Sequence, residues 1–223
     1  MSTLTLVRHG QAGPFQRENA PLTALGEAQA AKLAQFWLHS KVEFEEVYSG
    51  TLARQVRTEQ IVGESFRGAG RHWPSPVRDA AWNEYDATGV LRQSAEFELP
   101  GESPDEYRKF QRMFEAAMTR WLEGAIEADG VESWPLFRDR VSDAIQRLMA
   151  GPPGRRVAVF TSGGPIGFTV HSSLQAPARA FLDVNWRVRN TSITQFIFDR
   201  SRLTLDCFNT FPHLAEASLW TYR

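Results

Sequence analysis

Cysteine and long apolar runs are scarce in this 223-residue chain. Its one cysteine, Cys207, excludes an internal disulfide framework and a zinc site built from cysteines. Cys207 lies in an apolar run, so we expect it to be a small buried residue. The sequence shows no apolar stretch of about 18 residues and no basic-then-apolar leader, features that would indicate a membrane span or a signal peptide. A cytoplasmic location is the resulting expectation.

Lysine is also rare, and the formal net charge of the chain is close to zero. The chain has 25 Lys and Arg against 26 Asp and Glu, and its only lysines are Lys32, Lys41 and Lys109. With a formal net charge of −1, nothing global points to nucleic acid or to an anionic membrane as a partner. Arginine, which dominates the basic residues, suits bidentate phosphate contacts better than lysine does.

Length and pattern predict a single α/β domain over residues 1–223. Strands are expected at 3–8, 46–49, 156–160, 191–198 and 203–208, and an extended segment at 76–82. Helices are expected at 24–39, 52–66, about 103–130 and 133–150, and after 162, with N-caps at Thr23, Ser103 and Ser133. The alternation of strands and helices predicts a three-layer sandwich, with a mainly parallel central sheet and helices on both faces.

The segment Leu4–Gly10 carries the most informative residues. A short apolar strand delivers Arg8, His9 and Gly10 in succession, at the strand end where open α/β sheets bind ligands. A cation beside an imidazole can hold a phosphate against a nitrogen nucleophile. The alternative is a surface ion pair for Arg8 and a packed, hydrogen-bonded His9, and the tripeptide alone does not exclude it.

Three other strand ends carry polar residues. Ser49–Thr58 places Arg54 on a helix that follows a strand, Trp82–Asp86 contains Glu84, and Phe160–Pro165 is a strand-to-helix junction. Each has a structural alternative. Arg54 could be a solvated charge, and Glu84 could cap a turn and leave Asp86 as the proton donor. Arg57 is expected to be a surface or ion-pair residue.

Taken in order, and with Pro21-Leu22-Thr23 between the first two, these segments resemble the histidine phosphatase superfamily, also called the phosphoglycerate mutase-like family. The resemblance runs from residue 3 to about 173. It implies the α/β fold already expected, with a helical cap insertion at about 85–135 that covers the substrate together with Glu84.

The resemblance also implies a mechanism. His9 would take a phosphoryl group from a small phosphate ester, forming phosphohistidine. Arg8 and Arg54 would bind the phosphate oxygens, and the amide of Gly163 at a helix N-terminus would add to that site. Glu84 would protonate the leaving alkoxide and then activate water. No cofactor and no metal is implied, and the activity expected is that of a phosphomonoesterase.

One residue departs from the family pattern. Ser162 stands where most relatives have a second histidine, and its hydroxyl can donate to a phosphate but brings no positive charge. The enzyme could work with Ser162, His213 could replace the missing imidazole, or the protein could bind a phosphate ligand with little turnover. A mutase that returns the phosphoryl group to its substrate is a further alternative. Gln11 is expected to line the pocket. The natural substrate and the oligomeric state are not predicted.

Overall fold

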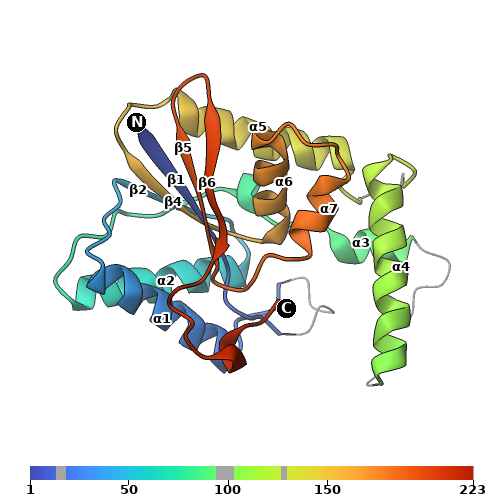
Figure 1. The fold of residues 1–223 in the computed structure, drawn as a ribbon, viewed down its shortest axis with the longest axis horizontal. Helices are drawn as coiled ribbons and strands as arrows, with labels where there is room; N and C mark the ends of the chain where they lie inside the picture. The colour runs from blue at the N-terminus through green and yellow to red at the C-terminus, as the bar shows by residue number, and fades with distance from the viewer. Residues whose placement is uncertain (14–18, 94–102, 127–129, 223) are drawn as a thin grey trace.

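A six-stranded mixed sheet organises the molecule (Figure 1). The structure, a computed structural model, describes residues 1–13, 19–93, 103–126 and 130–222. The sheet order is β3-β2-β4-β1-β5-β6. The strands are β1 (Ser2–Arg8), β2 (Glu46–Ser49), β3 (Val77–Arg78), β4 (Arg156–Thr161), β5 (Ile193–Phe198) and β6 (Leu203–Thr210). Neighbours from β3 to β1 pair in parallel, and only the pairings of β5 with β1 and β6 are antiparallel. The mainly parallel sheet is as predicted.

Helices cover both faces of this sheet, which confirms the predicted layers. They are α1 (Ala24–His39), α2 (Ala53–Gly68), α3 (Ala87–Arg92), α4 (Pro104–Leu122), α5 (Trp134–Ala150), α6 (Gly163–Ser173) and α7 (Ala180–Asn185), with short 3-10 helices η1 (Ala80–Trp82) and η2 (Ala217–Leu219). Figure 1 shows α1 and α2 on one side of the sheet and α5, α6 and α7 on the other. No helix in the described part of the chain is long and apolar enough to cross a membrane.

The central strands are buried on both faces, which explains their uninterrupted apolar sequences. On β1, Leu4 and Leu6 pack into the larger core with α5, α6 and α7, whereas Val7 packs into the second core with α1 and α2. Successive side chains of a strand point to opposite faces. The strand that carries Arg8 and His9 is therefore fixed from both sides.

The predicted caps are present at three helix starts. Thr23 accepts a hydrogen bond from the Gly26 amide, Ser103 forms a reciprocal capping box with Glu106, and Ser133 accepts from the Leu136 amide. Helices α3 and α7 were not anticipated from the sequence. Residues 94–102 and 127–129 of the expected cap lie outside the described residues.

Two local predictions were wrong. Segment 76–82 is extended only at its start, because Asp79 accepts a hydrogen bond from the Ala81 amide at 2.9 Å and turns the chain into η1. This turn lies directly before Glu84. Cys207, on the edge strand β6, is half-buried rather than buried.

Candidate active site

His9 extends from the carboxyl end of β1, where its backbone N–H donates to the Thr161 carbonyl at 2.9 Å. The following residue has to be glycine, because a Cβ on Gly10 would lie 2.4 Å from the carbonyl oxygen of Gly26. The loop that follows His9 is therefore packed directly on the start of α1. This close approach holds the imidazole at the edge of the sheet.

The hydrogen bonds of His9 define its tautomer. Nδ1 lies 2.7 Å from the Gly10 carbonyl oxygen, which can only accept, so Nδ1 carries the proton. Nε2 lies 3.2 Å from Nε of Arg54, which can only donate. Burial, and then the charges of Arg54 and Arg8, hold the pKa of His9 well below its usual value of 6.5. The ring is neutral, with the lone pair of Nε2 directed toward a cation.

Two arginines approach His9 from different elements. Arg8 ends β1 and donates to the Val188 carbonyl oxygen. Arg54 lies in the first turn of α2. Thr58 connects that turn to the backbone after His9, since its hydroxyl accepts from the Gly10 amide at 3.0 Å and donates to the Arg54 carbonyl at 2.7 Å. The guanidinium of Arg54 is thus positioned against the imidazole.

Glu84 reaches the same place from the segment after η1. Its carboxylate accepts from the Gly164 amide, at the start of α6, at 2.9 Å and 3.2 Å. Desolvation raises the pKa of Glu84 above its usual 4.5, while Arg54 and the Gly164 amide oppose that shift. Asp86, the alternative proton donor, instead accepts from the Gly89 amide and caps α3.

Helix α6 begins at Gly163, the residue whose amide is expected to bind phosphate. The next amide along, that of Gly164, donates to the Glu84 carboxylate. A Cβ on Gly163 would lie 2.7 Å from Oδ1 of Asn185, which packs against this turn. A Cβ on Gly164 would lie 2.1 Å from the Glu84 carboxylate, so glycine is required there for that carboxylate to approach.

Arg8, His9, Arg54 and Glu84 line one cavity of about 1190 Å³. Three segments widely separated in sequence therefore converge on one space that is large enough for a small organic ligand. The structure brings these four predicted residues together.

Four other predicted site residues are not among the described residues that line this cavity: Gln11, Ser162, Gly163 and His213. Ser162 is fully buried and its hydroxyl accepts from Nε2 of Gln55 at 2.8 Å. The Gln11 side chain accepts from the Thr23 hydroxyl at 2.9 Å.

His213 is buried beside Thr191, whose backbone N–H donates to the carbonyl oxygens of Arg8 and His9. Its Nε2 lies 2.9 Å from the hydroxyl of Thr191, and its ring lies 6.3 Å from that of Phe36 on α1. Burial lowers the pKa of His213 to about 4. A neutral, enclosed imidazole does not supply the positive charge that Ser162 lacks.

Several residues of the cavity wall were missed by sequence reasoning. They come from α3, α4, α7, the two residues after α7 and the C-terminal end of the described chain. They include Thr88, Gln111, Phe114, Asp183, Trp186, Arg187 and Tyr222. Helix α7 has no side-chain N-cap hydrogen bond, so the usual sequence signal for a helix start is missing. In the described part of the chain, no group of three or more His, Cys, Asp or Glu side chains could hold a metal ion.

Comparison with known proteins agrees with this geometry. Residues 4–210 match the family model of the histidine phosphatase superfamily (branch 1). Phosphoglycerate mutase-like protein 4 of Arabidopsis thaliana is 27% identical over 221 residues, which are 96% of this chain and 87% of that protein. The chain belongs to the histidine phosphatase superfamily.

Solved structures share the fold. A putative alpha-ribazole-5'-P phosphatase from Escherichia coli matches with a TM-score of 0.69 at 23% identity, covering 94% of this chain and 96% of that one. A mutant phosphoserine phosphatase from Entamoeba histolytica, in complex with phosphoserine, matches with a TM-score of 0.68 at 20% identity, covering 96% and 100%. Both are phosphatases by name, and at these identities they support the fold.

Proposed function

We propose that this protein is a phosphomonoesterase that acts on a small phosphorylated metabolite through a phosphohistidine intermediate. The observation that carries the proposal is the neutral His9, whose Nε2 faces Arg54 within a cavity that Arg8 and Glu84 also line. Family membership and the phosphatases among the structural neighbours support the same reaction class.

In the first half-reaction, Nε2 of His9 attacks phosphorus, and the bond from phosphorus to the ester oxygen breaks. Arg8 and Arg54 offset the charge on the phosphoryl oxygens as the transition state forms. Glu84, whose pKa is raised by desolvation, gives its proton to the departing alkoxide. The alcohol leaves, and a phosphoryl group remains bonded to nitrogen.

In the second half-reaction, the Glu84 carboxylate takes a proton from water, and the water oxygen attacks phosphorus. The bond from phosphorus to nitrogen breaks and inorganic phosphate is released. His9 returns to its neutral form and Glu84 to its acid form. General acid–base assistance of this kind contributes about 10²–10⁴ in rate.

Ser162 supports one alternative, a protein that binds phosphate ligands with little turnover. The position carries no charge, and the Ser162 hydroxyl is buried against Gln55. Arg8 and Arg54 would still bind the anion in such a protein.

One experiment decides between enzyme and binding protein. Hydrolysis of 4-nitrophenyl phosphate is compared for the wild type and His9→Ala, together with acid-labile incorporation of phosphate from a labelled ester. We expect activity and labelling in the wild type and neither in the variant. Equal rates for the two proteins would refute the phosphatase. Binding of phosphate by a wild type that has no activity would favour the alternative.

A further inference from the structure

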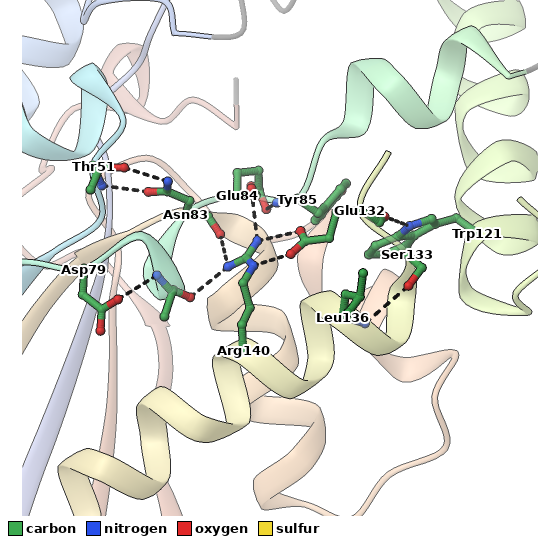
Figure 2. A network of polar contacts seen from close by, with 11 residues as sticks. Thr51, Asp79, Asn83, Glu84, Tyr85, Trp121, Glu132, Ser133, Leu136 and Arg140 are labelled. Carbon is green, nitrogen blue, oxygen red and sulfur yellow. Dashed lines mark hydrogen bonds and ion pairs between the residues drawn. The ribbon is translucent and has the colours of Figure 1, made fainter. Parts of the chain in front are cut away.

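Arg140 lies on α5, outside the cavity, and binds the chain segment that carries Glu84 (Figure 2). Its Nη1 donates to the carbonyl oxygens of Ala81 at 2.8 Å and Asn83 at 2.9 Å. Its Nη2 donates to the carbonyl oxygen of Glu84 at 3.3 Å. One guanidinium therefore fixes three backbone carbonyls within four consecutive residues.

These carbonyls lie in and after η1, where the chain is not part of the sheet, so no neighbouring strand donates to them. A buried carbonyl without a hydrogen-bond donor costs free energy of folding. Arginine presents five donors in a planar fork and can satisfy several acceptors at once. Lysine carries a point charge on a flexible stem and cannot reproduce this geometry.

Glu132 completes the arrangement. Its carboxylate pairs with Arg140 through Nε and through Nη2, the latter at 2.8 Å. The ion pair is about three-quarters buried, with side-chain exposures of 23% and 24%. The guanidinium also lies 4.8 Å from the ring centre of Phe137. The Phe137 ring and the Glu132 carboxylate therefore orient the Arg140 guanidinium, and the carboxylate also balances its charge.

The same segment is held on its other side by two further donors. The Trp82 carbonyl accepts from Gln55 Nε2 at 3.0 Å and from the Thr161 hydroxyl at 2.6 Å. The backbone before Glu84 is thus held from α5 and from the α2 side of the molecule. The position of the Glu84 carboxylate depends on this backbone.

We propose that Arg140, with Glu132, is a positioning residue that sets the place of the Glu84 carboxyl group relative to the leaving oxygen. This rests on the proposed function, in which Glu84 is the proton donor. Arg140 touches neither substrate nor reacting atoms in this scheme. Its loss displaces the acid while Arg8, His9 and Arg54 stay in place.

The test uses two substrates that differ in their need for an acid. The 4-nitrophenolate ion leaves without a proton, whereas the alkoxide of glycerol 2-phosphate requires one. The value of kcat/KM reports the steps up to release of the alcohol. For Arg140→Lys and Glu132→Gln we expect a loss of about 10–100-fold on the alkyl ester, the size of effect that misplacing a catalytic group produces. The loss on the aryl ester should be about threefold or less.

Controls separate positioning from folding. Arg138→Lys makes the same change on the same helix at an exposed ion pair with Asp139, and it should leave both substrates unchanged. Competitive inhibition by inorganic phosphate should be the same in all variants, since Arg8 and Arg54 are untouched. If Arg140→Lys does not fold, the same comparison of the two esters with Glu132→Gln tests the positioning role.

An equal loss on both esters, or no loss on either, would overturn the positioning role. A wild-type activity that survives His9→Ala would instead overturn the proposed function. The two failures are therefore distinguishable in the same set of assays.

Discussion

The guanidinium of Arg54 lies beside the imidazole of His9, with 3.2 Å between Nε of the arginine and Nε2 of the histidine. The contact brings a cation from α2 to the nitrogen at the end of β1. A phosphoryl group transferred to Nε2 would therefore form next to a positive charge already in place. Such preorganised electrostatic stabilisation is often the largest single contribution to catalysis.

Arg54→Gln is expected to lower kcat/KM for 4-nitrophenyl phosphate by about 10²–10³, the usual cost of removing one preorganised transition-state donor. Arg57→Gln is the matched control, one turn further along α2. Arg57 pairs with Glu27 and Glu64 at the surface, as the sequence predicted, and its replacement should change kcat/KM by less than about twofold, in line with the small worth of exposed ion pairs. Comparable losses in the two variants would argue against a specific role for Arg54.

The pH dependence should reflect Glu84. Its raised pKa keeps the acid protonated to higher pH than an exposed glutamate, and the lowered pKa of His9 keeps the nucleophile neutral at mildly acidic pH. The ratio of kcat/KM for the wild type to that for Glu84→Gln, measured on glycerol 2-phosphate, should be largest at acidic pH. It should decline as pH rises through the Glu84 pKa, because the wild type then loses its proton donor. Ionisation of the substrate cancels in this ratio, and a flat ratio would contradict the assignment.

Ser162→Ala should affect stability more than phosphate binding. The change removes one acceptor of the Gln55 amide in a fully buried position, which costs about 1–2 kcal/mol of unfolding free energy. The inhibition constant for inorganic phosphate should stay within about twofold of the wild type, a shift below about 0.4 kcal/mol. Denaturant unfolding and competitive inhibition together measure both effects. A weakened phosphate affinity at unchanged stability would place the hydroxyl on the anion instead.

His213 should make the fold sensitive to acid. Its pKa is lowered to about 4 by burial, so between that pH and 6.5 the unfolded chain binds a proton that the folded chain does not. Stability should therefore fall as pH decreases through this window, by about 3 kcal/mol for this residue. His213→Gln cannot take up that proton, so its unfolding free energy should change less between pH 7 and 4 than that of the wild type. Parallel pH profiles for the two proteins would rule out this contribution.

The sequence predicted those parts of the fold that local signals define. The strand predicted at 3–8, the caps at Thr23 and Ser103 and the parallel sheet all follow from apolar runs and capping residues. The prediction failed at 80–82, where the side chain of Asp79 bends the backbone. Helix α7 was missed because its first turn carries no capping hydrogen bond.

The candidate site was predicted in part, for a related reason. Arg8 is the last residue of a strand and His9, Arg54 and Glu84 come after strands. The carboxyl ends of parallel strands meet at one edge of the sheet. The burial of Ser162 against Gln55, and the use of the Gly164 amide by Glu84, depend on how α2, η1 and α6 pack together. No local pattern in the chain reports that packing.

The position of β1 in the middle of the sheet has a consequence for how activity is lost. β1 is hydrogen-bonded to β4 on one side and to β5 on the other, so we expect its backbone N–H groups to exchange with solvent mainly when the whole domain opens. Fraying of the outer strands should therefore leave His9 in place. As denaturant concentration increases, loss of activity should coincide with global unfolding. Backbone hydrogen–deuterium exchange along Leu4–Val7 should be among the slowest in the protein.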